Sequence, residues 1–475
     1  MSGVVLIFTL PLLAAVLVYL LRRWPLPSAL LAGVSALALG LLLWRWPNDQ
    51  SVLFLGRVIV VNRPVILFGQ TFAMQPSAQW VLGMLSLTLV GVYLGAWRIS
   101  QGRTFFPFGL GLLTLFGAAL TLQSAWNAPI LLAALVAVGA FVVQAGRQGT
   151  TRGATRLLWL PVLVIPLFLL ASWFAGQAAL DAENGQLLQQ AGQLASFGLL
   201  ILLAPWPLHG SAVSLGEEAP PLVAAWLLAA LSAAAITLLQ SLLVQYEWLQ
   251  SATLFYTLPA LRLGELLLYG GMATCLWAGM AAAVQNTLSR LWSYAALFAY
   301  GTVLISIGLG ARGSWALVWL LMFARTTGLV ASAFGLAAIR QRAGGSTSFE
   351  AVQGVGTRLP WTTAVYLIGL LSLAGMPLTA GFAGQWALLQ ALGSQDWLQA
   401  VVVLAGALGL IVGLIRALSA LLGPLRNLLL QREERLMVWL AGVALLAVLL
   451  PALLPTVWLR PLSAAVAAFS AGSGL

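Results

Sequence analysis

The chain contains few side chains that can exchange protons or bind metals. Of its 475 residues, 22 are basic and 11 are acidic, with one histidine, His209, and one cysteine, Cys275. All 22 basic residues are arginines. Cys275 lies inside an apolar run, which favours a buried structural thiol and leaves no role for a disulfide. Because no Cys/His metal cluster, phosphate-binding loop or Ser-His-Asp order is visible, we expect neither a catalytic centre nor a cofactor on this chain.

Arg325 is the charge placed deepest in an apolar segment, within residues 322–328 (MFARTTG). A guanidinium stays protonated at any working pH, so Arg325 cannot relay protons as a lysine can. It is expected to be a fixed charge. That charge either makes a structural pairing, with a carboxylate of a partner chain or a lipid headgroup, or lies in a water-filled path. Arg416 is expected to extend its side chain to the polar end of its segment.

His209 comes shortly before Glu217 and Glu218. Histidine titrates near neutrality, and an adjacent carboxylate would raise its pKa, so this group is a candidate entry point for protons. The alternative is a solvated loop that is merely acidic. Glu265 opens an apolar segment, where a carboxylate favours a helix N-terminus, and is predicted to be a capping charge.

The composition is that of a membrane protein. Hydrophobic residues make up 61% and charged residues 7% of the chain, against about 25% charged in a soluble domain. So few charges cannot cover a soluble surface, whereas lipid tails cover apolar helices without them. The net charge of +11 does not indicate nucleic-acid binding, because the arginines are scattered between apolar runs and form no stripe.

Apolar runs of about 20 residues predict membrane-spanning helices, and the chain contains about fourteen of them. The first run is expected to be a retained span, because two arginines follow it and a small-residue cleavage site does not. The predicted spans are 4–21, 24–44, 77–97, 104–123, 125–145, 157–177, 191–208, 219–240, 263–284, 291–309, 313–339, 361–392, 397–421 and 436–458.

The arginines predict the orientation of these spans, because cytoplasmic loops carry an excess of positive charge. With the N-terminus outside, fifteen arginines face the cytoplasm and six face outward, so both termini are expected on the outer side. The fifteen are Arg22, Arg23, Arg98, Arg103, Arg147, Arg152, Arg156, Arg290, Arg340, Arg342, Arg358, Arg416, Arg426, Arg432 and Arg435, and the six are Arg45, Arg57, Arg63, Arg262, Arg312 and Arg460.

Three segments depart from plain helix. Residues 51–72 are rich in Val, Ile and Phe and are broken by Asn-Arg-Pro, which predicts a small β-hairpin on the external face. The seventh span ends in APWPLH (204–209), and the twelfth contains GMP (375–377) followed by AGFAG (380–384). Proline removes a backbone donor and glycine loosens the helix, so both spans are predicted to be interrupted. Such breaks mark either an ion path, as in transporters, or a kink that accommodates a neighbouring helix.

Three stretches of sequence resemble the antiporter-like membrane subunits of respiratory complex I, Mrp antiporters and membrane-bound hydrogenases. Residues 207–209 (PLH) with 218–221 (EAPP) are similar to the family signature PLHxWLPDAHxEAPTP. Residues 285–294 (QNTLSRLWSY) resemble QTDIKRLLAYSS. Residues 354–360 (GVGTRLP) with 371–382 (LSLAGMPLTAGF) resemble GLGxRxP and LSLAGIPPTAGFIGKF, closest to the N chain of NADH–quinone oxidoreductase. The resemblance covers residues 50–420 and implies an inverted-repeat fold, with repeat-like bundles at 104–240 and 263–421.

The resemblance also implies a set of intramembrane ionisable residues, and this chain lacks them. The family's lysines on spans seven and eight fall on Leu202 and Ala233, and its Lys or Glu on span twelve falls on Gln385. The span-five glutamate should lie near Ala134, where no acid is present, and the lysine of the second stretch is replaced by serine beside the retained Arg290. Buried lysines suit proton transfer because desolvation lowers their pKa, so the usual proton relay is missing.

Three functions remain open. The first is a subunit of the membrane arm of a complex I-like NADH–quinone oxidoreductase, in the inner membrane of a prokaryote, taking part in proton or cation translocation. The second is a degenerate, non-conducting scaffold of such a complex. The third is a solute transporter with Arg325 as an anion contact. The expected partners are other membrane subunits and lipids, with candidate ion-path or structural residues at His209, Glu218, Arg325, Gln385 and Arg290.

Overall fold

A computed structural model describes most of the chain. The described residues are 2–45, 51–54, 57–60, 63–102, 104–144, 152–180, 185–251, 253–255, 258–310, 315–424 and 433–454. The part of the predicted fourteenth span after residue 454 lies outside these ranges. Six of the arginines used to predict the orientation also lie outside them: Arg103, Arg147, Arg312, Arg426, Arg432 and Arg460.

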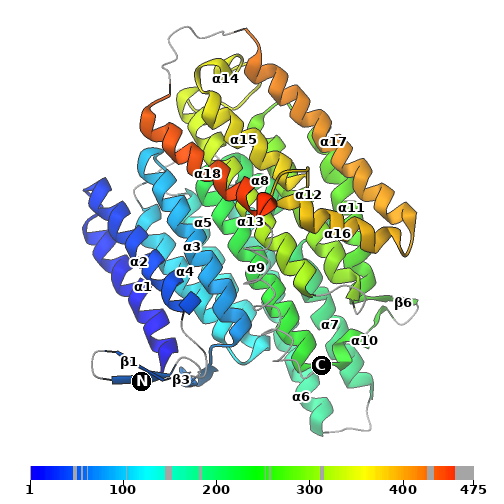
Figure 1. Cartoon of the computed structure of the whole chain (residues 1–475). Helices are drawn as coiled ribbons and strands as arrows, with labels where there is room; N and C mark the ends of the chain where they lie inside the picture. The colour runs from blue at the N-terminus through cyan, green and yellow to red at the C-terminus, as the bar shows by residue number, and fades with distance from the viewer. Residues whose placement is uncertain are drawn as a thin grey trace.

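Helices make up nearly all of the described chain and run roughly side by side (Figure 1). Several begin with proline in the first turn, where its missing N–H is no loss. The helices are α1 Gly3–Leu20, α2 Pro25–Arg45, α3 Pro76–Arg98, α4 Phe105–Thr121, η1 Ala125–Asn127, α5 Ala128–Gln144, α6 Arg152–Leu180, α7 Gly185–Leu203, α8 Gly210–Glu218, α9 Pro221–Gln245, α10 Trp248–Ser251, α11 Leu263–Ala283, α12 Leu288–Gly308, α13 Trp315–Arg342, α14 Val355–Arg358, α15 Pro360–Leu373, α16 Gly381–Gly393, α17 Trp397–Leu422 and α18 Arg435–Leu453.

The predicted all-α polytopic membrane fold is confirmed. Twelve helices of the described chain are long and apolar enough to cross a membrane, and two shorter apolar helices, α4 and α15, add to them. Most predicted ends agree within a few residues. The larger differences are in α6, which is longer at both ends than the predicted 157–177, in α7, which begins six residues before the predicted 191 and ends five before 208, and in α9, which ends five residues after the predicted 240.

The core of the molecule is formed by α9, α12 and α13. These three helices lie between the N-terminal helices α1–α4 on one side and the packed pair α11 and α17 on the other (Figure 1). In the most apolar 18-residue stretch of α9, 94% of the residues are buried inside the molecule, against 17% in the corresponding stretch of α18. Alanine-rich α9 suits this place because small side chains let neighbouring backbones approach closely. The peripheral helices expose Leu, Val and Trp, as expected for surfaces that contact lipid.

The expectation of one hairpin at 51–72 is corrected. Two separate two-stranded antiparallel sheets are present, β1 Ser51–Phe54 with β2 Arg57–Val60 and β3 Val65–Leu67 with β4 Gln70–Phe72. Pro64 lies between them and has no N–H to offer a strand. The second turn contains Phe68 and Gly69, both with positive φ. A third pair, β5 Thr253–Phe255 with β6 Leu258–Arg262, was not predicted.

The two predicted interruptions are confirmed. Helix α7 ends at Leu203, Ala204 has a φ of 44°, and α8 begins only at Gly210. Helix α15 ends at Leu373, Gly375 has a φ of 74°, and α16 begins at Gly381. These positive φ values cannot continue a right-handed helix, so the backbone leaves and re-enters helical geometry in the middle of both segments.

Candidate functional site

The first interruption opens onto a small cavity between the helices. The cavity has a volume of about 100 Å³, room for about three water molecules at about 30 Å³ each. Its lining comes from the end of α7, the start of α8, and facing turns of α5, α6, α9, α12 and α13. The polar side chains in this lining are Ser211, Ser232, Tyr300 and Arg325. The break in α7 therefore brings loosened backbone and polar groups to one place in an apolar bundle.

Arg325 is the charged side chain of this cavity. It is 4% exposed and is the one charged residue buried in the described part of the chain. Its Nη1 donates to Ser232 Oγ at 2.8 Å and to the Leu228 carbonyl oxygen at 3.5 Å, both on α9. Its Nε donates to the Ala296 carbonyl oxygen of α12 at 3.4 Å. The guanidinium thus joins the three central helices.

The charge of Arg325 is stabilised by dipoles and a ring rather than by a carboxylate. The guanidinium carbon lies 5.1 Å from the centre of the Tyr300 ring, within reach of a cation–π interaction. No ion pair within the described ranges includes Arg325. A buried charge without a counterion costs several kcal/mol, which favours water or an anion in the adjoining cavity.

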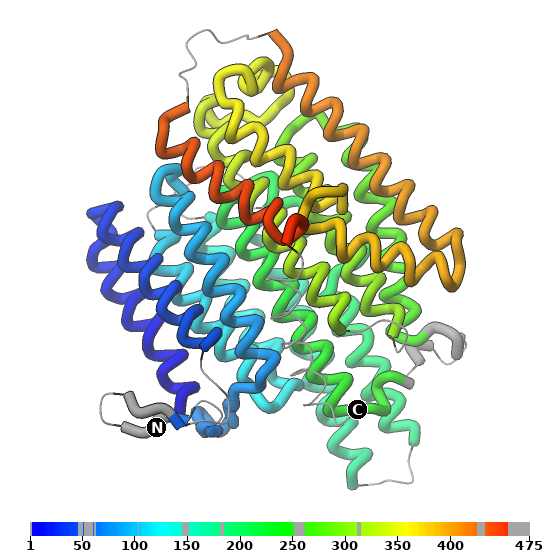
Figure 2. Tube along the Cα trace, viewed as in Figure 1, coloured from blue at the N-terminus to red at the C-terminus, as the bar shows by residue number. Residues whose placement is uncertain are grey.

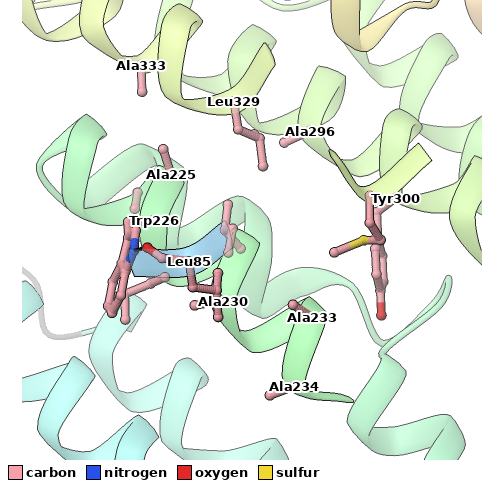
Figure 3. Packing of buried hydrophobic residues seen from close by; sticks show 14 of the residues in the cluster. Leu85, Ala225, Trp226, Ala230, Ala233, Ala234, Ala296, Tyr300, Leu329 and Ala333 are labelled. Atoms are coloured by element: carbon pink, nitrogen blue, oxygen red, sulfur yellow. Dashed lines mark hydrogen bonds between the residues drawn. The ribbon is translucent and has the colours of Figure 1, made fainter. Parts of the chain in front are cut away.

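The two positions at which the family resemblance predicts lysines lie beside this cavity. Leu202 is part of its lining. Ala233 is fully buried on α9, directly after the Ser232 that accepts from Arg325. Figure 3 shows the methyl groups of Ala233 and Ala234 on α9 and the Tyr300 ring on α12. Neither replacement can carry a proton, and the nearby positive charge comes instead from α13.

Gln385 lies at the second interruption and is not among the residues that line the Arg325 cavity. It is 6% exposed, and its side chain packs against the turn at Gly375, where an added Cβ would come within 2.5 Å of Gln385 Cγ. Ser372 Oγ accepts from the Gly381 amide at 3.2 Å and joins the two halves of the broken helix. The Gln385 side chain therefore fills the space behind the break, and its amide cannot gain or lose a proton.

His209 and the two glutamates are not adjacent, so the candidate entry group is not assembled as one site. His209 precedes the first turn of α8 and Glu218 ends that helix, which separates them by about 13 Å at 1.5 Å per residue. The His209 ring makes an edge contact with Trp277, with ring centres 6.4 Å apart. Its Nδ1 is buried and has no hydrogen-bond partner in the described chain. The sequence indicates a loop from His209 to the glutamates, but residues 210–218 form the helix α8, which separates the two ends of the segment.

The glutamates of α8 bind other elements. Glu218 Oε2 accepts from the Gly153 amide of α6 at 2.7 Å. Glu217 forms an ion pair with Arg290 at 3.0 Å, between exposed side chains at the start of α12. These contacts link α8 to α6 and α12 at the end of the broken helix.

Two further sequence predictions concern helix ends. Glu265 lies in the first turn of α11, and its Oε2 accepts from the Arg262 backbone amide at 3.5 Å, which confirms the capping role of Glu265. Arg416 donates to the Asn286 side chain at 2.6 Å and to the Ala283 carbonyl oxygen, so it closes the end of α11 instead of extending freely. Sequence reasoning missed Ser232 and Tyr300, because hydroxyls in apolar runs give no signal unless their partner is known.

Residues 169–411, slightly more than half of the chain, match the family described as NADH:quinone oxidoreductase/Mrp antiporter, transmembrane. Subunit N of the NADH-quinone oxidoreductase of Psychrobacter arcticus is 30% identical over 239 residues, which are 48% of this chain and 46% of the relative. Subunit N 1 of Solidesulfovibrio magneticus is 27% identical over 328 residues, 66% of this chain and 68% of the relative. The chain spans about half the length of most of the curated relatives it matches.

Solved structures share the fold over nearly the whole chain. A chain of the Mrp complex from Dietzia superposes with a TM-score of 0.79 at 16% identity, covering 98% of this chain and 96% of that one. A chain of respiratory complex I from Thermus thermophilus gives 0.76 at 18% identity, covering 98% of both. A chain of an archaeal membrane-bound sulfane sulfur reductase gives 0.78 at 16% identity, covering 98% and 97%. This multi-pass protein of the bacterial inner membrane therefore belongs to the NADH:quinone oxidoreductase/Mrp antiporter transmembrane family.

Proposed function

We propose that this chain is a membrane-arm subunit of a complex I-like NADH–quinone oxidoreductase and takes part in proton or cation translocation coupled to electron transfer. The observation that carries the proposal is the interrupted helix α7–α8, which opens onto a mainly apolar cavity with the buried Arg325 and three hydroxyl groups in its wall. Electron transfer and quinone reduction belong to other chains of the assembly, because this chain has no redox centre in its sequence.

Arg325 takes part as a fixed charge. Since a guanidinium does not deprotonate, it cannot pass a proton to a neighbour. It instead sets the potential that protons and titrating groups of adjacent subunits experience. At an effective dielectric constant near 20, two unit charges about 20 Å apart interact by about 0.8 kcal/mol. That is enough to shift the protonation of a neighbouring site several-fold.

A non-conducting scaffold is the second candidate, and a specific observation favours it. Leu202, Ala233 and Gln385 occupy the positions where the family has its ionisable groups, and all three are uncharged. Ala233 is also fully buried against its neighbours, with no space for a substitute water at that position. In this reading, the fold is retained to hold neighbouring subunits and to seal the membrane arm.

The proposed arrangement in the membrane rests on the distribution of the arginines for the orientation and on the family resemblance for the two bundles. Both termini lie on the outer side, and the partners are other membrane subunits and lipids. Residues 104–240 and 263–421 form the two repeat-like bundles. In support, the fourth long segment of each bundle, α7–α8 in the first and α15–α16 in the second, is the interrupted one. Co-purification in mild detergent identifies the partner chains.

The test uses the intact assembly in proteoliposomes with a pH-sensitive dye. Arg325→Met removes the fixed charge, while Arg325→Lys keeps a charge that can deprotonate. If the chain takes part in translocation, Arg325→Met lowers the number of protons moved per electron pair, and Arg325→Lys restores part of the loss. A pure scaffold leaves this ratio unchanged as long as the assembly stays intact, which a subunit analysis of each preparation checks.

The chain reconstituted alone supplies the complementary measurement. We expect little proton flux from it, because no titrating relay crosses the described bundle. Substantial flux that disappears on Arg325→Ala or His209→Ala would overturn the scaffold reading and assign a conducting path to this chain by itself.

A further inference from the structure

A long apolar groove runs along one side of the bundle, away from the Arg325 cavity. Its volume is about 530 Å³, and its walls are turns of α2, α3, α13, α16 and α18 with one residue of α9. Figure 2 shows α18, in red, beside α3, in light blue, so a helix near the end of the chain lies next to the N-terminal helices α2 and α3. Leu41, Trp44, Leu94 and Val443 line the groove and are about half exposed. The groove therefore opens sideways, toward the lipid.

The groove is long enough to hold the acyl chain of one leaflet. Along α3 its lining runs from Trp80 to Gly95, about 22 Å at 1.5 Å per residue. One leaflet contributes about half of a hydrocarbon core that is about 30 Å thick. An acyl chain of ordinary length thus fits along the groove within the apolar part of the membrane.

A charged cavity of about 80 Å³ continues the groove at one end. Three helices of the groove, α3, α13 and α18, also line this cavity with their next turn. Arg98 follows Leu94 on α3, Ala338 follows Phe334 on α13, and Met437 precedes Leu440 on α18. The charged residues of this lining are two arginines and two glutamates, Arg98, Arg342, Glu433 and Glu434. The groove and the cavity together form an apolar slot with a polar mouth.

The charges of the mouth are arranged loosely enough to accept a ligand. Glu434 pairs with Arg342 at 3.0 Å and with Arg98 at 3.8 Å, and its side chain is 52% exposed. Glu433 accepts from the Thr362 amide at 2.8 Å and from the Trp361 amide at 3.2 Å, which fixes it at the start of α15. A long, exposed ion pair such as Arg98–Glu434 contributes little by itself, so a ligand can replace it at small cost.

We propose that this slot binds a phospholipid with a zwitterionic ethanolamine headgroup. One acyl chain lies in the groove, the phosphate binds Arg98 and Arg342, and the ammonium group binds Glu434. Two positive and two negative side chains at the mouth complement a headgroup that carries one charge of each sign. The phosphate gains charge-assisted hydrogen bonds from the guanidinium groups, and the ammonium group donates to the carboxylate. An anionic headgroup lacks the second interaction and meets two glutamates.

The first experiment blocks the groove. Gly91 lines it, and a Cβ built there meets no atom within 4 Å, so Gly91→Phe directs a bulky side chain from an unobstructed position into the groove. Gly33 on α2 has the same free space and does not line the groove, so Gly33→Phe is the matched control. The purified full chain is exchanged into nanodiscs that contain phosphatidylethanolamine, phosphatidylglycerol and phosphatidylcholine, and retained lipid is quantified by native mass spectrometry. We expect Gly91→Phe to reduce retained phosphatidylethanolamine at least several-fold and Gly33→Phe to leave it unchanged.

The second experiment tests the headgroup. Glu434→Gln removes the partner of the ammonium group and is expected to lower the preference for phosphatidylethanolamine over phosphatidylglycerol about threefold, the size of effect typical of one exposed ion pair. Arg98→Gln is expected to weaken retention of both lipids. Phosphatidylcholine, which has no ammonium N–H, should bind more weakly than phosphatidylethanolamine to the unaltered chain.

Three outcomes would overturn the proposal. Equal retention of phosphatidylethanolamine by the Gly91→Phe and Gly33→Phe variants would show that the groove holds no lipid. An unchanged headgroup preference in Glu434→Gln would remove the role of the charged mouth. Loss of a protein subunit from the intact assembly of Gly91→Phe, with lipid content unchanged, would identify a partner helix as the occupant.

Discussion

At the scale of single residues, the unusual feature is a buried charge whose partners are all neutral. Arg325 is bound by the Ser232 hydroxyl, two carbonyl oxygens and the Tyr300 ring. Hydrogen bonds to a charged group contribute about 1.5–3 kcal/mol each, more than neutral ones. The contact with Ser232 is therefore expected to matter for stability as well as for the potential in the cavity.

We expect Ser232→Ala to destabilise the folded chain by about 1–3 kcal/mol, because it leaves a buried charge short of an acceptor. The effect should be smaller when Arg325 is already methionine, so a double-mutant cycle of unfolding in detergent should give a positive coupling energy. Ser306→Ala is the control, since that hydroxyl donates only within its own helix, to the Val303 carbonyl oxygen. Equal effects of Ser232→Ala with and without Arg325 would contradict the coupling.

At the scale of elements, the two interrupted helices depend on residues that break helical geometry. Gly375 has a φ of 74° and leaves no space for a side chain, because a Cβ there would meet Gln385 Cγ at 2.5 Å. The break after α15 is therefore determined both by the backbone conformation and by the packing of Gln385 behind it. Substitutions at this point test whether the fold requires the interruption.

Gly375→Ala is expected to lower the stability of the chain by about 2 kcal/mol or more, from the left-handed conformation and the clash together. Gln385→Gly removes both the Cβ and the Cγ that an added Cβ at Gly375 would meet, at 2.6 and 2.5 Å, so Gly375→Ala should cost less in the Gln385→Gly background than in the unaltered chain. Gly393→Ala, at a position with no atom within 4 Å of an added Cβ, serves as the control. The measurement is thermal unfolding of the full chain in detergent, and a Gly375→Ala variant as stable as Gly393→Ala would refute this account.

At the scale of the whole molecule, the hairpins and the start of α1 lie at one end of the bundle and α14 lies at the opposite end (Figure 1). The excess of arginines predicts that the α14 end faces the cytoplasm. The chain is well suited to a labelling test, because its only cysteine, Cys275, is fully buried.

Single cysteines placed at Phe68 and Ser346 should react with a membrane-impermeant maleimide from opposite sides. Phe68 is fully exposed in the turn between β3 and β4, and Ser346 is exposed in the segment after α13. In intact cells we expect labelling of Phe68→Cys and none of Ser346→Cys, with the reverse in inverted vesicles and no signal from the unaltered chain. Labelling of Ser346→Cys in intact cells would mean that the orientation is inverted.

Much of the architecture was predictable from the sequence. The spans followed from the lengths of apolar runs, and the two interruptions followed from Pro and Gly, because these residues act on the backbone whatever surrounds them. The loss of the family's ionisable groups at Leu202, Ala233 and Gln385 is implied by the resemblance and stays a prediction. The division of residues 51–72 into two hairpins was missed, because the pairing of short strands depends on turn geometry.

The sites themselves were decided by the tertiary structure. Ser232 and Arg325 are 93 residues apart in sequence, and Arg98 and Glu434 are farther apart still, yet each pair meets in space. His209 and Glu218 are close in sequence but are separated by the length of α8. Hydropathy and backbone preference act locally, so a sequence determines which segments cross the membrane. Which side chains share a cavity depends on how the helices pack, and that emerges only when the whole bundle is assembled.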